Sequence, residues 1–212
     1  GSNVNKFFHL PQVGASRVLV VDGDPGPNPV LSGVYFLERA LAPWGGSEVM
    51  TGGVLPDVTS MAGIRDLDPD VHQVVFLANV SDPAPAAAPL VDFVQQGGSV
   101  VISMGSNVTA ERYNGALAKL MPSPLRKAVA LTNPGEPGVP TAIPNTDSGF
   151  FAPFARGGRG SFANIRWKNL FTLEPYIDGP DLRTIMTLEN GMPLLVERKV
   201  GQGSVLLFTG TL

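Results

Sequence analysis

The sequence predicts an α/β fold, in which a mostly parallel β-sheet is covered on both faces by helices. In the first half of the chain, apolar runs typical of buried strands alternate with segments whose apolar residues recur at helical spacing. Strands that alternate with helices in this way form parallel sheets with both faces buried. The length of 212 residues is enough for one such domain with a substantial core, and two large independent domains are not expected.

The first strand is expected in RVLVVDGDPGPNP, residues 17–29, where a run of branched residues ends in an acidic loop rich in Gly and Pro. A helix is expected in VLSGVYFLERALAPWG, residues 30–45, because its apolar residues fall on one face. That face carries Val34, Leu37 and Leu41. The segment SEVMTG, residues 47–52, is predicted as a short second strand.

The next elements continue the alternation. HQVVFLANV, residues 72–80, is predicted as the third strand, and APAAAPLVDFVQQGG, residues 84–98, as a helix closed by glycine. SVVISMG, residues 99–105, is the fourth strand, and TAERYNGALAKLMP, residues 109–122, is a helix that stops at its proline.

The second half of the chain changes character. Residues 123–165 are rich in Pro, Gly and Asn with little periodicity, so an irregular excursion packed on the surface is expected. From residue 169 onward, strand-like runs are separated by tight turns at Asn190-Gly191 and Gly201-Gln202-Gly203. We therefore expect an antiparallel extension at one edge of the sheet.

Composition excludes several classes of protein. With 43% hydrophobic residues, 16% charged residues and a net charge of −3, the chain is typical of a soluble globular domain. It has no basic stripe for a nucleic acid and no apolar run of the roughly 18 residues that a membrane span needs. The absence of cysteine excludes thiol catalysis, thiolate metal sites and disulfides. Gly1 and Ser2 are typical of a purification tag, and residues 1–15 are interpreted as tag and N-terminal extension.

The acidic loop after the first strand is a candidate binding site. Ligands of open α/β sheets bind outside the carboxyl ends of the strands, where Asp22 and Asp24 are expected, so a cation, hydroxyl or sugar site is conceivable there. The structural interpretation is favoured, because Asp, Gly and Pro are turn formers whose carboxylates bond backbone amides. Gly23 and Gly26 do not make a phosphate-binding fingerprint, since the third glycine and the lysine are missing.

Histidines and acidic clusters give no metal site. His9 precedes the first strand, and His72 begins the third strand at the end of the sheet opposite to the expected site. Neither has a partner at metal-ligand spacing. Asp66, Asp68 and Asp70 alternate as in a calcium loop but lack its sixth-position glycine and closing glutamate. No metal and no cofactor is therefore predicted.

Together, RVLVVDGDP, FLERALAP, VVFLANV, LVDFVQQGGSVVISMG, YNGALAKLMP and GMPLLVERKVGQGSVLLFTGTL resemble the class I glutamine amidotransferase-like domains. More narrowly, they look like the degenerate version near the C-terminus of bacterial membrane proteins of the aerotolerance-operon type, which also carry von Willebrand factor A-like domains. The resemblance covers residues 16–212, interpreted as one domain cut from a longer chain, and is weakest over 123–165. It implies a flavodoxin-like three-layer sandwich.

The resemblance also bears on catalysis. In active amidotransferases a cysteine stands two residues before a glycine at the turn after this strand, and here Ser103 and Gly105 take those places. Active members also carry a late histidine and glutamate, whereas this chain has no histidine after His72. A serine needs a positioned base to act as a nucleophile. Glu111, Asp147, Glu174 and Lys199 are available as bases, and their spacing selects none of them.

Three functional hypotheses follow. The first is a non-catalytic domain that binds other domains of the same chain or protein partners within a larger, membrane-anchored bacterial protein, outside any membrane span and facing the periplasm. The second is a hydrolase that uses Ser103 with an unusual base. The third is a small-ligand or carbohydrate binder at the carboxyl edge of the sheet. The residues expected at that edge are Asp22, Asp24, Asn79, Ser103, Gly105 and Ser106.

Overall fold

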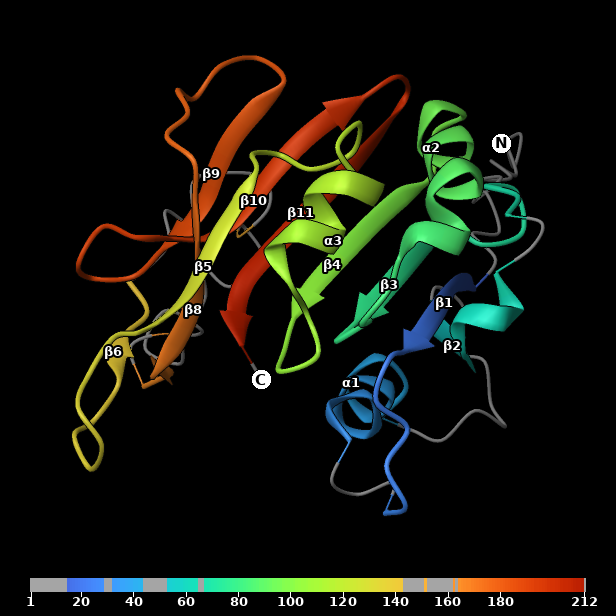
Figure 1. Ribbon diagram of the computed structural model, residues 1–212. Helices are drawn as coiled ribbons and strands as arrows, with labels where there is room; N and C mark the ends of the chain where they lie inside the picture. Colours follow the sequence, from blue (N-terminus) through green and yellow to red (C-terminus); the bar gives the residue numbers. More distant parts are fainter. Residues whose placement is uncertain are drawn as a thin grey trace, which may run out of the picture.

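The centre of the molecule is a β-sheet whose parallel part has the order β2-β1-β3-β4-β11 (Figure 1). These strands are Val54–Thr59, Ser16–Asp22, Val74–Ala78, Ser99–Met104 and Gly203–Thr211. Each neighbouring pair among them is parallel. In chain order this is the 2-1-3-4-5 arrangement of flavodoxin-like sheets, so the predicted fold class is confirmed. The computed structural model describes residues 15–28, 32–43, 53–64, 67–142, 151, 162 and 164–211.

Helices cover both faces of this sheet. Helices α2, Ala87–Gln95, and α3, Ala110–Ala116, pack on one face, and α1, Gly33–Leu41, packs on the other. Alternate residues of β1 show the division, because Leu19 and Val21 join the α2 and α3 cluster whereas Val18 and Val20 join that of α1. The arrangement is a three-layer sandwich, as expected.

Local sequence explains where these helices begin and end. Ser32 caps α1, since its hydroxyl oxygen accepts a hydrogen bond from the backbone N–H of Val34 at 3.1 Å. The face predicted for α1 is confirmed, because Val34, Leu37 and Leu41 all belong to the same apolar cluster. Helix α2 is entered through a 3₁₀ turn, Ala84–Ala86, and is followed by Gly97 at φ 111°, a conformation that favours glycine.

The C-terminal half adds antiparallel strands. Strands β9, Leu182–Thr187, and β10, Pro193–Val200, extend the sheet antiparallel beyond β11. Strand β11 is itself parallel to β4, so the last strand lies inside the sheet and joins its two halves. Gly191 at φ 83° and Gly201 at φ 60° lie in the two predicted turns, which is why glycine is needed there.

A second branch leaves the sheet near the end of β11. Strand β8, Asn169–Leu173, pairs with β11 through Leu170 and Gly210, and β5, Leu125–Ala130, pairs with β8. A small sheet of β6, Val139–Pro140, and β7, Arg166–Trp167, lies beside this branch (Figure 1). An apolar cluster around Leu170, Leu188 and Leu194 forms the core of this end.

Two element predictions differ from the structure or fall outside it. The stretch 123–165, expected to be irregular, contains β5 and β6 in its described part. The second strand lies at Val54–Thr59, while the segment 47–52 predicted for it lies outside the described residues. Strand β2 contains Pro56, and a proline within a sequence argues against a strand because it cannot donate a ladder hydrogen bond. It is tolerated here because β2 is an edge strand. Among the described residues, no helix has the length and apolar character needed to cross a membrane.

Candidate functional site

The carboxyl ends of β1, β3 and β4 bring three of the predicted site residues together. Asp22 ends β1, Asn79 follows β3 and Gly105 follows β4. Strands β1 and β3 are neighbours at the point where the strand order reverses, which is where doubly wound sheets bind their ligands. Asp22, Asn79 and Gly105 therefore lie at the edge of the sheet where the sequence predicted them.

Asn79 is the centre of this cluster. Its side-chain oxygen accepts a hydrogen bond from the backbone N–H of Asn107 at 2.8 Å, and its amide nitrogen lies 3.4 Å from a carboxylate oxygen of Asp24. Its own backbone N–H donates to the carbonyl of Ser103 at 3.2 Å. Asn79 has φ 49°, in the left-handed region that asparagine tolerates better than most residues. The side chain thus ties together the loops after three strands.

The acidic loop is tied to the same cluster. One oxygen of Asp22 accepts from the backbone N–H of Asp24 at 3.0 Å, and the other accepts from the hydroxyl of Ser32 at 3.2 Å. Ser32 also caps α1, so Asp22 connects the end of β1 with the start of the next helix. Asp22 therefore makes the backbone contact expected of a turn residue, whereas the Asp24 carboxylate contacts the side chain of Asn79.

Two glycines allow the loops to approach so closely. A Cβ atom on Gly105 would lie 2.3 Å from the side-chain oxygen of Asn79, and one on Gly23 would lie 2.3 Å from the Asn79 carbonyl oxygen. Gly105 was a candidate ligand-binding residue at the turn after β4, and its position against Asn79 supplies a packing reason for the glycine.

Ser103 lies inside β4, two residues before the turn. It pairs with Ala78 of β3 on one side and Phe208 of β11 on the other, and only 4% of it is exposed. Within the described residues its hydroxyl makes no hydrogen bond to a histidine, lysine or carboxylate. The exposed residue at the turn is Ser106.

A cavity of about 380 Å³ opens beside this turn, between β5, β8 and the end of β11. Its described lining contains amide and hydroxyl groups and no acidic or basic side chain. Those residues are Gly105, Ser106, Val108, Ala128, Val129, Ala130, Asn169, Phe171 and Thr211. General acid or base catalysis needs a titratable group within hydrogen-bond reach, and the described lining supplies none.

The other candidate bases lie elsewhere. Glu111 is in the first turn of α3, Glu174 pairs with Arg126 at 3.1 Å, and Lys199 is near the end of β10. The described structure gives none of the three a contact with Ser103. Asp147 lies outside the described residues.

His72 has a structural partner. Its Nε2 lies 3.0 Å from the Asp57 carboxylate, which also accepts from the guanidinium of Arg17 at 2.7 Å. Burial raises the pKa of Asp57, but the hydrogen bonds and charges of Arg17 and His72 outweigh burial and hold that pKa below its usual value. These three side chains link β2 to the starts of β1 and β3, so the role of His72 here is structural.

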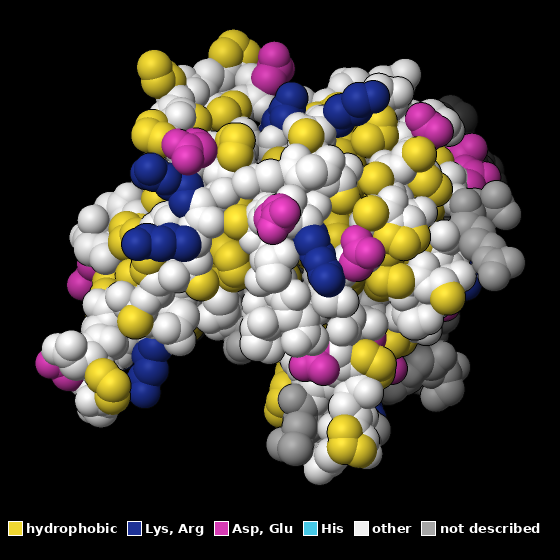
Figure 2. Space-filling model, viewed as in Figure 1, with side chains coloured by type: hydrophobic (Ala, Val, Ile, Leu, Met, Phe, Trp, Pro, Cys, Tyr) yellow, Lys and Arg dark blue, Asp and Glu magenta, His cyan; other side chains and the backbone are white. Residues whose placement is uncertain are grey.

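Within the described part of the chain, no group of three or more His, Asp or Glu residues is arranged to hold a metal ion. Asp68 accepts a hydrogen bond from the backbone N–H of Asp70 at 2.8 Å, as an acidic turn requires, while Asp66 and His9 lie outside the described residues. On the face in Figure 2, Lys and Arg side chains are scattered among acidic and neutral ones.

Sequence reasoning missed two members of the cluster, Ser32 and Asn107. Ser32 precedes Gly33 at the start of an apolar periodic segment, which is an N-cap signal. Asn107 follows Gly105 and Ser106 in a turn, where asparagine is common. Both signals were present, but only the fold shows that these side chains reach Asp22 and Asn79.

Comparisons with known proteins show the fold. No family model matches the chain, and a search of curated proteins found no match. Among solved structures, a cytoplasmic protein from Salmonella typhimurium LT2 aligns with a TM-score of 0.62 at 14% identity, over 92% of this chain and 88% of that one. A second cytoplasmic protein from Salmonella typhimurium aligns with a TM-score of 0.59 at 14% identity, over 92% and 87%.

Longer enzymes contain a similar fold. An exo-β-1,4-mannosidase from Opitutaceae bacterium strain TAV5 aligns with a TM-score of 0.55 at 14% identity, over 93% of this chain and 31% of the enzyme. A β-galactosidase from Bacillus circulans sp. alkalophilus aligns with a TM-score of 0.52 at 18% identity, over 92% of this chain and 28% of the enzyme. This chain therefore spans less than a third of each of these two enzymes.

Proposed function

We propose that this chain is a non-catalytic module that binds other domains of the same protein or protein partners, within a larger bacterial protein anchored in a membrane. The observation that carries the proposal is the hydrogen-bond network that joins the loops at the carboxyl edge of the sheet. The side chains of Asp22, Asn79 and Asn107 bond the loops after β1, β3 and β4 to one another. The exposed carboxylate of Asp24 contacts this network through one oxygen, 3.4 Å from the Asn79 amide nitrogen. Such a network stabilises the shape of the edge.

The position of Ser103 supports the same conclusion. A nucleophilic serine needs a base beside it and an exposed hydroxyl that a substrate can reach. Ser103 is buried between two strands, and the described part of the cavity next to Gly105 is lined without a titratable side chain. A buried Ser103 beside a described lining without a titratable group supports a domain that does not use this serine as a nucleophile.

The comparisons support the module part of the proposal. A similar fold forms less than a third of a mannosidase and of a β-galactosidase, so this architecture occurs within longer proteins. Fold alone does not determine function, and at these identities the likeness carries no activity to this chain. The membrane-anchored setting rests on the sequence resemblance, and in it the domain lies outside the membrane span.

The proposal is tested by combining turnover with assembly. Purified protein is assayed for ammonia release from glutamine and for hydrolysis of p-nitrophenyl acetate, with Ser103→Ala and Ser106→Ala as matched variants. We expect all three proteins to give the same background rate. The full-length protein is then solubilised, and the mass of its complexes is measured by light scattering with and without residues 16–212.

Deletion of residues 16–212 is expected to reduce the mass of the complexes by more than the mass of the deleted segment, whereas Ser103→Ala is expected to leave it unchanged. Turnover that Ser103→Ala abolishes would establish the hydrolase instead. If the complexes of the full-length protein persist without residues 16–212, the proposed role of this domain in assembly is wrong.

A further inference from the structure

A second cavity lies at the antiparallel end, where the sheet forks. Strand β10 pairs with β11 up to Leu195 and Phe208, after which Gly210 pairs with Leu170 of β8 instead. A strand has only two edges, and β4 occupies the other edge of β11. Strands β8 and β10 therefore diverge, and a cleft of about 620 Å³ opens between β8 on one side and β9 with the start of β10 on the other.

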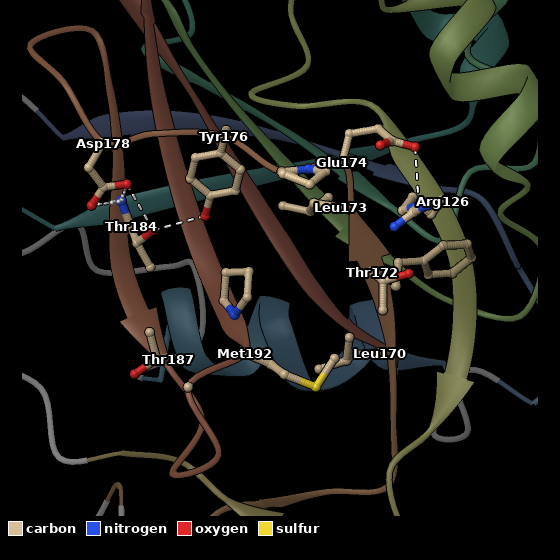
Figure 3. A pocket seen from close by; sticks show the side chains of 14 residues that line it. Arg126, Leu170, Thr172, Leu173, Glu174, Tyr176, Asp178, Thr184, Thr187 and Met192 are labelled. Atoms are coloured by element: carbon tan, nitrogen blue, oxygen red, sulfur yellow. Dashed lines mark hydrogen bonds and ion pairs between the residues drawn. The ribbon is translucent and has the colours of Figure 1, made fainter.

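The floor of the cleft is apolar and includes an aromatic ring. Tyr176 is half-buried there, and its hydroxyl lies 2.8 Å from that of Thr184 on β9. Figure 3 shows the ring of Tyr176 between the walls, with Met192, Leu173 and Leu170 completing the floor. Burial raises the pKa of Tyr176, so the ring is neutral at physiological pH.

Polar side chains stand on opposite walls. On one wall, Asp178 holds Thr184, accepting from its hydroxyl at 3.1 Å and from its backbone N–H at 3.1 Å. On the other wall, Nε of Arg126 pairs with Glu174 at 3.1 Å, and both side chains are about half exposed, at 56% and 47% (Figure 3). Within the described residues, the terminal nitrogens of Arg126 and the hydroxyl of Thr187 have no protein partner.

We propose that this cleft binds a neutral pyranoside unit of a carbohydrate, with the sugar ring against Tyr176 and its hydroxyls bonded to Arg126 and Glu174 on one wall and to Asp178 on the other. Sugar hydroxyls both donate and accept, so one ring satisfies the carboxylates and the guanidinium together. The described lining carries two carboxylates and one guanidinium, which disfavours phosphates and other anions. The volume lies within the range of small-molecule sites.

This inference goes beyond the proposed function, because it concerns a different cavity. The cleft shares only Phe171 with the cavity beside Gly105 in their described linings. Loss of sugar binding would therefore leave the turnover and assembly results unchanged, and the converse also holds.

The test is calorimetric titration and saturation-transfer NMR with cellobiose, β-1,4-mannobiose and lactose, with glucuronate as the anionic probe. We expect saturable binding of at least one neutral disaccharide with a dissociation constant of about 0.1–10 mM, as is usual for a shallow open site. Glucuronate is expected to bind more weakly. Saturation transfer should be strongest at the ring protons that lie against Tyr176.

The variants locate the site. Tyr176→Ala is expected to weaken binding about tenfold or more, whereas Tyr176→Phe keeps the ring and most of the affinity. Arg126→Gln gives a second test on the other wall if Tyr176→Ala fails to fold. Tyr35→Ala on α1, which removes a comparable ring outside the cleft, is the matched control and should bind as the unaltered protein does.

No saturable binding of any of the three disaccharides at ~10 mM would overturn the proposal. Binding that survives Tyr176→Ala and Arg126→Gln unchanged would place the sugar elsewhere and would also overturn it. Tighter binding of glucuronate than of the neutral sugars would contradict the charge argument.

Discussion

Asn79 was a candidate ligand-binding residue, and its contacts within the protein are enough to explain why an asparagine is present there. It lies at the carboxyl end of β3, at the reversal point of the sheet, in a left-handed conformation. Strained backbone at such a position often marks a ligand site. Here both ends of its amide are hydrogen-bonded within the protein, to Asn107 and Asp24. The residue type and its conformation are therefore explained by the joining of three loops.

The close approach of Gly105 to Asn79 gives a residue-level prediction. Gly105→Ala places a methyl group 2.3 Å from the Asn79 side chain, so the network must shift and the free energy of unfolding should fall by about 1–3 kcal/mol. Gly115→Ala in α3 is the matched control, since its Cβ meets no atom within 4 Å, and a helical alanine should stabilise by about 0.5–1 kcal/mol. Urea unfolding measures both. Equal effects of the two substitutions would mean that the loops at the edge do not depend on this contact.

At the scale of elements, the sequence predicted the strands and helices that have a clear hydrophobic periodicity. The strands β1, β3 and β4 and the helices between them were located because each has a continuous apolar run or a clear apolar face. Strand β5 was missed because its burial pattern is mostly exposed, with Arg126 and Lys127 in its middle. The fork at Gly210 could not be predicted, because partner choice between β8 and β10 depends on tertiary packing.

The same limit applies to the candidate site. The edge residues Asp22, Asn79 and Gly105 were predicted from the general rule on strand ends, and that rule depends only on strand order. The cleft at Tyr176 was not predicted, because its walls come from segments more than 40 residues apart, Arg126 and Glu174 among them. Single-sequence patterns carry no information about such distant pairs.

Strand β5 depends on one side chain of α3, which gives a prediction at the element scale. Asn114 donates to the carbonyl of Leu125 at 2.8 Å and accepts from its backbone N–H at 2.8 Å, so it replaces a ladder partner at the start of this strand. Asn114→Ala leaves both groups unpaired and should lower the free energy of unfolding by about 1–3 kcal/mol. Hydrogen exchange at the Leu125 amide should accelerate more than exchange in β1. Uniform acceleration throughout the chain would contradict this local role.

For the whole molecule, β11 decides whether the parallel and antiparallel halves act as one unit. Val205 and Leu207 belong to the apolar cluster under α2 and α3, whereas Phe208 packs against the cluster around Leu188 at the antiparallel end. The strand also pairs with β4, β10 and β8. An element shared by two cores couples their unfolding, because neither core can keep its packing once the strand leaves.

This coupling predicts that damage to either core is felt in both. Leu207→Ala and Leu188→Ala each truncate a side chain that is at most 1% exposed, one in each cluster, and each should lower the free energy of unfolding by about 2–5 kcal/mol. If the molecule unfolds in a two-state manner, the most protected amides of β1 and those of β9 should lose equal protection within each variant. Native-state hydrogen exchange measures this directly. If Leu188→Ala instead accelerated exchange in β9 and left β1 unchanged, the antiparallel end would be a separate unit, and β11 would hold it to the parallel sheet without coupling the two.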